Sequence, residues 1–337
     1  MVNGWIILDK PVGLGSTQAV GAVKRVLRQS GYGKVKVGHG GTLDPMACGV
    51  LPIALGEATK LCGRMLDASK EYAFTIGFGA ETDTLDLEGR VVAENAVRPT
   101  LAEIEAVLPR FTGAIEQVPP AFSALKVDGE RAYDRARAGE AVVLKARGVT
   151  VHALEILPTG GEGDHAQRGG GVSLDRPVLG KGKPLHQPAA GPPPRQAGED
   201  LVTLHAKVSK GTYIRSLARD IAQALGACGH VTYLCRTRAG PFDLTNAISL
   251  DRLNEIGNGA PLENVILPLE AGLDDIPALD LGPEQARAVR QGRVLAGLPR
   301  SDGIYYARLG AIPVALVELV SGEARVLRGF NFPDVAE

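Results

Sequence analysis

The spacing of apolar residues divides most of the chain into predicted strands and helices. Alternation with period two, the spacing of one face of a strand, runs through residues 72–78 and 202–208. Short apolar runs at 5–8 and 50–55 also have the length of strands. The alternating positions of the first stretch are Tyr72, Phe74, Ile76 and Phe78. We therefore expect a sheet whose buried face carries these side chains.

Helical spacing occurs in three places. Residues 20–27, 58–66 and 214–225 each carry apolar side chains three or four positions apart, which predicts amphipathic helices. Ser16 and Thr17 are good N-cap residues for the first of these helices.

Arg215 falls in the first turn of the third predicted helix, for which Thr212 is the expected cap. A cation in this position opposes the positive end of the helix dipole. We therefore expect Arg215 to be held by a partner. A carboxylate from another loop is the obvious candidate, because a guanidinium pairs with a carboxylate through two parallel hydrogen bonds.

The pattern breaks at residues 158–200, which are dense in glycine and proline and poor in apolar periodicity. Such a segment cannot bury enough surface to order itself, so it is interpreted as a flexible insertion between two strands. Beyond Pro277 the chain shows a short helical stretch and then several short strands punctuated by glycine. This predicts a small separate β domain at the C-terminus.

Length and charge limit the possible functions. A chain of 337 residues with 45% hydrophobic residues has room for two domains and a substantial core. The net charge of -1 and the pI near 6.6 argue against a protein that is basic overall, as dedicated nucleic-acid binders often are. Any RNA site must therefore be a local basic patch.

The cysteines and the N-terminus indicate the compartment. Four scattered cysteines with no CxxC pair form neither a disulfide framework nor a zinc site, so they are expected to be reduced. The first residues lack the features of a signal peptide, and no apolar run reaches membrane-spanning length. We expect a cytoplasmic protein without membrane contact.

One carboxylate, Asp44, lies in a glycine-rich loop just before the apolar run at 50–55. Pro45 stiffens the backbone after it and favours an extended conformation at Asp44 itself. His39 places an imidazole close by in the sequence. The glycines that would let a ligand approach the main chain are Gly38, Gly40 and Gly41. An isolated Asp-Pro is usually a surface turn, but this loop is long and leads into a buried strand.

Two stretches are basic enough to meet phosphate. Residues 119–147 interleave aromatic and basic side chains, which suits a surface that grips an RNA backbone. Acidic residues neutralise part of this stretch, so an ordinary charged helix fits equally well. The predicted helix at 20–27 and its end carry Lys24, Arg25 and Arg28, which suit a solvated face or a phosphate contact. The sequence does not decide between these alternatives.

Four segments resemble the TruB family of tRNA pseudouridine synthases, in the order in which the family carries them. The similarity covers nearly all of residues 4–240 outside the Gly/Pro insertion. The segments read ILDKPVG, GHGGTLDPMACGVLPIALGEATK, KEYAFTIGFGAETDTLD, and SKGTYIRSLARDIA followed by YLCR. Their GTLDP and KGTYIR parts are specific to the family.

The resemblance implies roles for six residues. Asp44 corresponds to the catalytic aspartate, Tyr72 to the active-site tyrosine, and Arg215 to the arginine that pairs with the aspartate. The residues implied in substrate binding are His39, where the target base is extruded, and Tyr213 and Leu234, which line the uracil pocket. No metal site is implied. From the strand pattern alone, Tyr72 would simply be a core tyrosine.

The resemblance also implies an α+β fold with a mixed, mainly antiparallel sheet flanked by helices and loops. A catalytic domain is expected at 1–275, with a tRNA-gripping insertion at about 119–150, and a PUA-like RNA-binding β domain at 277–337. The implied function is isomerisation of uridine-55 in the T loop, on the T arm of tRNA. A monomer that works without guide RNA is expected.

The sequence departs from the family in three places. Gly40 stands where many members carry threonine, and Ala80 and Glu81 precede TDT where an arginine is usual. The long insertion at 158–200 is extra. The first two departures could weaken RNA contacts without affecting the acid.

The chemistry suits these residues. Making pseudouridine requires breaking the bond from N1 to C1′, turning the free uracil, and joining C5 to C1′. Asp44 can attack C1′ as a nucleophile or act as a base that helps to form a glycal, and Tyr72 can take part in a late proton transfer. The base must be flipped out of its loop, and His39 is placed to fill the gap. No cofactor or metal is required.

Three alternatives remain. A non-catalytic RNA-binding or tRNA-folding module would have no use for a carboxylate that repels phosphates. A guide-dependent sister enzyme would lack the insertion at about 119–150. A metal-dependent hydrolase using Asp83 and Asp86 is disfavoured, because the sequence shows no ligand cluster around them.

Overall fold

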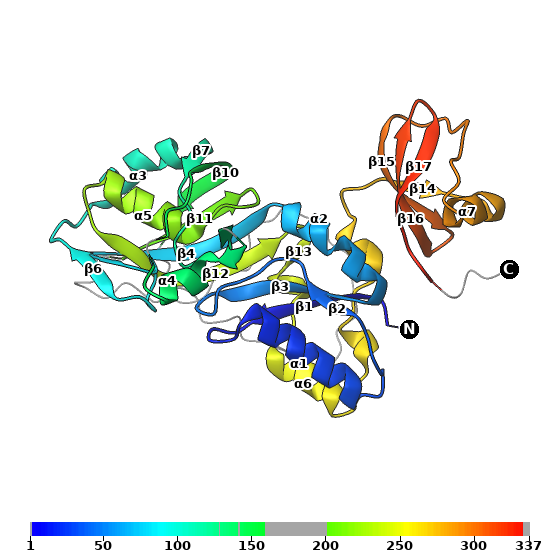
Figure 1. The fold of residues 1–337 in the computed structure, drawn as a ribbon, viewed down its shortest axis with the longest axis horizontal. Helices are drawn as coiled ribbons and strands as arrows, with labels where there is room; N and C mark the ends of the chain where they lie inside the picture. The colour runs from blue at the N-terminus through cyan, green and yellow to red at the C-terminus, as the bar shows by residue number, and fades with distance from the viewer. Residues whose placement is uncertain (1, 128, 141, 159–200, 333–337) are drawn as a thin grey trace.

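The computed structural model describes residues 2–127, 129–140, 142–158 and 201–332. It contains a large sheet flanked by helices and a smaller C-terminal unit, joined by a connecting segment (Figure 1). The predicted insertion at 158–200 lies outside the described residues except for Pro158.

The large sheet has nine strands. Strands β3 and β12 pair in parallel through Cys48 and Cys235, and every other pairing described in this sheet is antiparallel. The prediction of a mainly antiparallel mixed sheet is confirmed. Its order is β1 (Gly4–Lys10), β3 (Cys48–Leu55), β12 (Gly229–Ala239), β4 (Lys70–Phe78), β11 (Leu201–Val208), β10 (Arg147–Ile156) and β7 (Gly113–Gln117), with β2 (Val37–His39) beside β3 and β13 (Phe242–Asp243) beside β12.

Helices pack near the β1 edge of this sheet and on its central strands. Helix α1 (Ser16–Gln29) lies against α6 (Leu250–Gly257) near β1, and α5 (Ile214–Ala224) contacts β12 and β4 (Figure 1). None of the helices in the described parts of the chain has the length and apolar character needed to cross a membrane. The remaining helical pieces of this part of the chain are α2 (Cys62–Asp67), α3 (Leu101–Val107), α4 (Ala132–Arg137), η1 (Gly56–Leu61), η2 (Leu108–Phe111), η3 (Leu244–Asn246), η4 (Leu262–Asn264) and η5 (Leu269–Gly272).

The core follows the predicted periodicity. Phe74 and Ile76 of β4 are fully buried, while Tyr72 and Phe78, at the two ends of the same face, are half-buried and pack against this core. The buried stripe of α1 covers the sheet with Val20, Val23, Val26 and Leu27, the four positions predicted from helical spacing. Burial of these side chains is the main force that holds the helix against the sheet.

Two helices have N-caps other than the expected ones, because the expected hydroxyl makes a different hydrogen bond. Gly15, not Ser16 or Thr17, is the N-cap of α1, because the Ser16 hydroxyl bonds to the backbone of Leu43. Tyr213, not Thr212, is the N-cap of α5. The Thr212 hydroxyl donates instead to the carbonyl of Ser209 at 3.0 Å.

The predicted helix at 58–66 is divided between two helical types. The chain forms the 3₁₀ turn η1 first and enters the α-helix α2 only at Cys62. The apolar positions Ala58, Leu61 and Met65 are nevertheless buried, as their spacing predicts.

Two small ribbons extend from the sheet. Strands β5 (Ala80–Thr82) and β6 (Val91–Glu94) form a hairpin, and the stretch between them is rich in polar residues. Strands β8 (Lys126–Val127) and β9 (Glu130–Arg131) form the other ribbon, and α4 follows it directly.

The C-terminal unit is a four-stranded sheet with one helix. Its strands follow the order β14 (Ala278–Asp280), β15 (Gly303–Leu309), β16 (Ile312–Val320) and β17 (Glu323–Gly329), and the helix is α7 (Pro283–Arg290). The unit has its own apolar core around Val289, Val317 and Leu319. This agrees with the small β domain predicted after Pro277.

A second apolar cluster joins the two units. It packs Trp5 and Phe242 of the large sheet with Tyr306 and Phe330 of the C-terminal unit. The indole N–H of Trp5 donates to the carbonyl of Leu269 at 3.0 Å, so the buried polar atom of this side chain is satisfied. The C-terminal unit is therefore packed onto the sheet by apolar residues.

The close approach of β3 and β12 gives a test of the fold. Gly49 has φ +101°, and a Cβ at this position would lie 2.2 Å from the carbonyl oxygen of Arg236. We expect Gly49→Ala to lower the free energy of unfolding by about 2 kcal/mol or more, through strain and collision. Gly148→Ala in β10 is the control, because no atom lies within 4 Å of its Cβ position. Urea unfolding of both variants measures the difference, and equal stability would contradict the described packing.

Candidate active site

Asp44 lies in the loop that connects β2 to β3. The side chain of Asp44 is 38% exposed, so its carboxylate is open to a ligand on one side. The backbone around it is tied down, since Ala47 N donates to the carbonyl of Asp44 at 3.1 Å and Gly13 N to that of Pro45 at 2.8 Å. The loop thus presents one accessible acid on a fixed main chain.

Arg215 makes the ion pair predicted from its place in α5. Its Nη2 lies 2.9 Å from Oδ2 of Asp44, and its Nη1 lies 3.2 Å from Oδ2 of Asp86. Arg215 is 5% exposed and Asp86 only 3%, so the second pair is buried while Asp44 faces outward. One guanidinium therefore bridges two carboxylates, and only one of these is accessible.

Further hydrogen bonds fix the guanidinium. Nη1 of Arg215 donates to the carbonyl of Thr84 at 2.8 Å, and Nη2 donates to that of Phe122 at 3.0 Å. These carbonyls come from the turn after β5 and from the segment before β8. Arg215 therefore ties both connections to the helix that carries it.

Asp86 was missed as a site residue by the sequence reasoning, which considered it only for a metal site. Its Oδ1 accepts hydrogen bonds from the Thr84 hydroxyl at 2.5 Å and from Glu88 N at 3.0 Å. Asp83 accepts from Arg90 N at 2.9 Å and closes the same turn. The two carboxylates are thus committed to protein contacts, which argues against the hydrolase alternative.

The turn that carries Asp86 is strained. Leu85 has φ +63°, a left-handed conformation that is costly for a residue with a branched side chain. Burial of the Leu85 side chain and the hydrogen bond from Val231 N to its carbonyl hold this conformation. Such strain persists only where surrounding contacts hold the backbone in place. In this conformation of the turn, the carboxylate of Asp86 faces Arg215.

Arg236 holds the loop of Asp44 in place through hydrogen bonds to its main chain. It is 1% exposed, and its guanidinium donates to the carbonyls of Val50 at 2.8 Å, Gly41 at 3.2 Å and Thr42 at 3.4 Å. Three carbonyls from the loop and from β3 thus converge on one buried cation. The signal in the sequence was an arginine within the apolar strand segment YLCR, and its structural role was not predicted.

Lys10 and Ser16 hold the other side of the loop. The ammonium of Lys10 donates to the carbonyls of Leu14 at 2.7 Å and Pro45 at 3.4 Å. Burial lowers the pKa of Lys10 to about 8. The Ser16 hydroxyl donates to the Leu43 carbonyl at 2.9 Å and accepts from Leu43 N at 2.8 Å. The loop before and after Asp44 is therefore anchored to β1 and α1.

His39 ends β2 at the entrance to this loop. It is half-buried, and its Nδ1 accepts a hydrogen bond from Gly41 N at 3.4 Å. Burial, followed by the positive charge of Arg236, lowers the pKa of His39 below its usual value.

Tyr72 and Leu234 lie on one face of the sheet. Leu234 of β12 stands opposite Phe74 of β4, two residues along from Tyr72, so Tyr72 and Leu234 are diagonal neighbours. Leu234 is buried and Tyr72 is half-buried against the same core. Within the described residues, Tyr72 and Asp44 share no hydrogen bond.

Tyr213 is held by its backbone. Gln117 accepts from Tyr213 N at 2.7 Å and donates to its carbonyl at 3.1 Å. The guanidinium of Arg147 lies 4.8 Å from the centre of the Tyr213 ring, in a cation–π contact. The ring is thereby positioned two residues before Arg215.

The basic stretch at 119–147 contains one compact cluster. Arg131 and Arg137 lie 5.7 and 5.6 Å from the ring centre of Tyr133. Arg135 pairs with Glu140 at 2.7 Å, as an ordinary charged helix would. The stretch therefore has features of both alternatives. Two cations lie on an aromatic ring, as on a surface that grips RNA, and one ion pair is neutralised, as in an ordinary charged helix.

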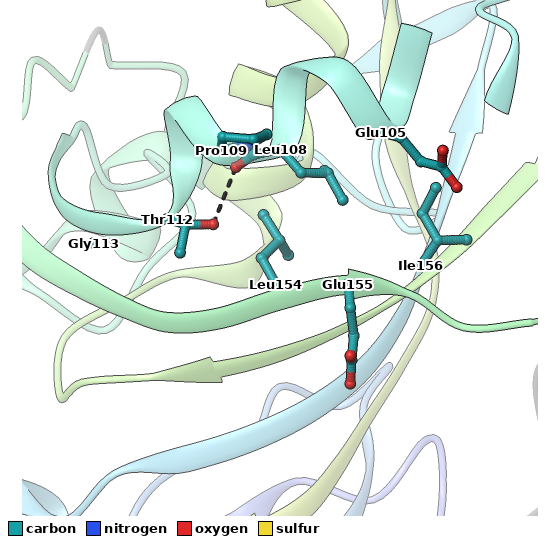
Figure 2. A pocket seen from close by; sticks show the side chains of 8 residues that line it. All are labelled: Glu105, Leu108, Pro109, Thr112, Gly113, Leu154, Glu155 and Ile156. Carbon is teal, nitrogen blue, oxygen red and sulfur yellow. Dashed lines mark hydrogen bonds between the residues drawn. The ribbon is translucent and has the colours of Figure 1, made fainter. Parts of the chain in front are cut away.

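A hollow of about 610 Å³ lies away from this site, between α3, η2 and β10 (Figure 2). Its lining combines apolar side chains such as Leu108 and Leu154 with the acidic residues Glu105 and Glu155, and the carboxylate of Glu155 points away from Leu154 (Figure 2). No basic side chain lines it, so it is unsuited to the phosphates of RNA.

Two of the departures from the family pattern have local explanations. A Cβ on Gly40 would lie 2.6 Å from Cβ of Met65, so a threonine there would require α2 to shift. Glu81 accepts a hydrogen bond from Gln223 of α5 at 3.3 Å. Both positions are therefore fitted to their neighbours in this chain.

Comparisons with known proteins identify relatives of this chain. Residues 24–167 match the family model described as TruB family pseudouridylate synthase (N terminal domain), and residues 215–274 match tRNA pseudouridylate synthase B C-terminal domain. A protein of Novosphingobium aromaticivorans called tRNA pseudouridine synthase B is 63% identical, over 100% of both chains. One of the same name from Zymomonas mobilis is 52% identical, over 98% of this chain and 97% of the relative.

Solved structures show the same fold. An H/ACA ribonucleoprotein bound to a substrate RNA containing 2′-deoxyuridine has a chain that is 23% identical, with a TM-score of 0.65 over 99% of this chain and 87% of that one. A chain of a Cbf5-Nop10-Gar1 complex is 25% identical, with a TM-score of 0.65 over 98% and 86%. The fold is that of the pseudouridine synthases. Within this class, the chain belongs to the TruB family.

Removing the buried charge beside Arg215 gives a test of the bridge. We expect Asp86→Asn to lower the free energy of unfolding by about 2 to 4 kcal/mol, because it leaves a buried guanidinium with one carboxylate fewer. Asp83→Asn, in the same turn but exposed, is the control and should stay within about 0.5 kcal/mol. Thermal or urea unfolding measures both, and equal losses would show that the bridge adds nothing specific.

The imidazole of His39 is expected to titrate below the usual pKa of 6.5, because its surroundings disfavour the charged form. The unfolded chain then binds more protons just below pH 6.5, so this histidine makes the protein less stable as the pH falls through that range. NMR titration of His39 measures the pKa, with protein unfolded in urea as the reference. A midpoint at or above the unfolded value would contradict the burial of His39.

Proposed function

We propose that this protein is a stand-alone tRNA pseudouridine synthase that isomerises uridine-55 in the T loop. The observation that carries the proposal is the ion pair between the accessible carboxylate of Asp44 and the buried guanidinium of Arg215, in a chain of the TruB family. An RNA-binding module has no need for such a pair, because a carboxylate in its site would repel phosphate.

Asp44 is the proposed catalytic group. Arg215 favours the ionised form of Asp44 and directs one of its oxygens, so the other can face the ribose. As a nucleophile it forms a bond to C1′ while the bond to N1 breaks and uracil leaves as an anion. As a base it removes the C2′ proton while the bond to N1 breaks, which gives a glycal and the uracil anion. C5 then bonds to C1′ as the bond from Asp44 to C1′ breaks in the first route, or as the proton returns to C2′ in the second. Both routes end when the proton on C5 is lost.

The remaining predicted residues are proposed to bind and turn the base. Tyr72 and Leu234 share one sheet face and can pack on the uracil ring, and Tyr72 can take part in the late transfer of the C5 proton. Tyr213 borders the same pocket. His39, at the end of β2, occupies the place that the flipped uridine leaves.

The division of the chain is part of the proposal. Residues 1–275 form the catalytic domain and 277–337 a PUA-like RNA-binding domain. The insertion at about 119–150 grips the T arm, supported by the clustering of Arg131 and Arg137 on Tyr133. We propose a monomer that acts in the cytoplasm, where its tRNA substrate is processed.

Independence from guide RNA is supported by similarity along the whole chain. Curated relatives that match nearly end to end carry the name tRNA pseudouridine synthase B, whereas the ribonucleoprotein chains are at most 25% identical in the two cases above. The chain also carries a segment at about 119–150 that the guide-dependent sisters were expected to lack.

The deciding experiment maps pseudouridine in unmodified tRNA transcript after incubation with purified protein in chelator. We expect one new pseudouridine, at position 55, with wild type and none with Asp44→Asn. The Asn variant should bind tRNA with nearly unchanged affinity, because the substitution removes charge but little volume. Tight binding by wild type without modification would instead indicate an RNA-binding module.

Arg215→Lys tests the ion pair separately from the acid. An ammonium keeps the charge but cannot contact Asp44, Asp86 and two carbonyls in the same planar arrangement. We expect turnover of saturating tRNA to fall at least about 10-fold, which corresponds to about 1.4 kcal/mol. Arg219→Lys, in the next turn of α5, is the control. Near-normal turnover of Arg215→Lys would contradict the proposed role of the pair.

A further inference from the structure

The chain from Lys10 to Leu43 is one-sided in charge. It contains six Lys or Arg side chains and no Asp or Glu, although the whole chain has 37 basic and 38 acidic residues. One of the six, Lys10, is buried beside the loop of Asp44. The other five are exposed on α1 and on the segment between α1 and β2.

Four of these cations surround a hollow of about 700 Å³. It lies between the C-terminal half of α1 and the segment that leads into β2, and the basic side chains that line it are Lys24, Arg28, Lys34 and Lys36. No carboxylate is part of the lining. Gly33, which has φ +68° and open space at its Cβ position, leaves part of the rim without a side chain.

Within the residues that the structure describes, the protein does not neutralise the four cations. In the described parts of the chain, none of them has a carboxylate partner within ion-pair distance. Some surface cations elsewhere are paired, such as Lys60 with Glu57 at 2.7 Å and Lys210 with Asp67 at 2.9 Å. Four like charges around one hollow raise the local positive potential and attract an anion with several negative groups.

The hollow is connected to the Asp44 loop by two elements. Ser16, the first residue of α1, is hydrogen-bonded to Leu43, and Lys24 lies eight residues further on, which is about 12 Å along a helix. Strand β2 runs from Val37, at the rim of the hollow, to His39 at the start of the loop. At the rise of about 3.4 Å per nucleotide of a stacked DNA strand, that distance corresponds to about four nucleotides.

We infer that this hollow binds phosphate groups of the substrate RNA backbone, a few nucleotides from the uridine at Asp44. The identity of the RNA as tRNA rests on the proposed function. Flexible ammonium groups and exposed arginines suit the phosphate backbone, which carries no sequence information but sets the position of the RNA. The role is one of positioning, separate from the chemistry of the uridine.

The test compares two arginines of the same helix. Arg28 lines the hollow, whereas Arg25 is exposed on the same helix but lies outside it. We expect Arg28→Gln to reduce the slope of log affinity for tRNA against log salt by about one, and Arg25→Gln to leave it unchanged. The combined variant Lys24→Gln, Arg28→Gln, Lys34→Gln should reduce it by two to three and weaken binding at least 10-fold at low salt. Circular dichroism checks that each variant is folded.

The outcomes separate this inference from the proposed function. Pseudouridine formed at saturating tRNA should stay within about twofold of wild type in all three variants, because none of the substituted residues touches the site of Asp44. Equal slopes for Arg25→Gln and Arg28→Gln, or an unchanged slope for the triple variant, would overturn the inference while leaving the synthase intact. A triple variant that binds tRNA normally but loses binding of polyglutamate would assign the hollow to an acidic protein. If wild type makes no pseudouridine but the slopes change as expected, the hollow stands and the proposed function fails.

Discussion

The structure depends on a single guanidinium that must be kept in place with very little water. Arg215 is almost fully buried, and a buried cation is costly unless anions and carbonyl oxygens surround it. Asp86 and the carbonyls of Thr84 and Phe122 supply that environment, and Asp44 completes it from the solvent side. Three connections that are far apart in the sequence are therefore brought to one helix. The fold and the geometry of the candidate site are consequences of the same interaction.

The loop of Asp44 is rigid for a related reason. Arg236 donates hydrogen bonds to carbonyls of this loop and of β3 on one side. Lys10 and Ser16 donate hydrogen bonds to carbonyls of the loop on the other side. All of these partners are main-chain atoms, so they fix the path of the loop whatever its side chains are. The carboxylate consequently has few positions available before a substrate arrives, which lowers the cost of organising the site in the transition state.

Much of this arrangement could be predicted from the sequence. Period-two spacing identified the face of β4, helical spacing identified α1 and α5, and the cation in the first turn of α5 predicted a carboxylate partner, which the structure contains. Asp86 and Arg236 could not be assigned in this way. Their partners are backbone atoms or a side chain more than a hundred residues distant, and local spacing carries no record of such contacts. The caps were wrong where Ser16 and Thr212 use their hydroxyls for other bonds.

The apolar cluster between the two units bears on how the chain folds as it is made. Trp5 belongs to the first strand, and Phe330 lies beyond the last strand, yet both are buried in the same cluster. During synthesis the N-terminal residues emerge first and domains generally fold as they appear. The surface around Trp5 cannot be covered in full until almost the entire chain has left the ribosome. The early strand must therefore remain partly uncovered for most of translation, and the completion of this cluster is among the last steps of folding.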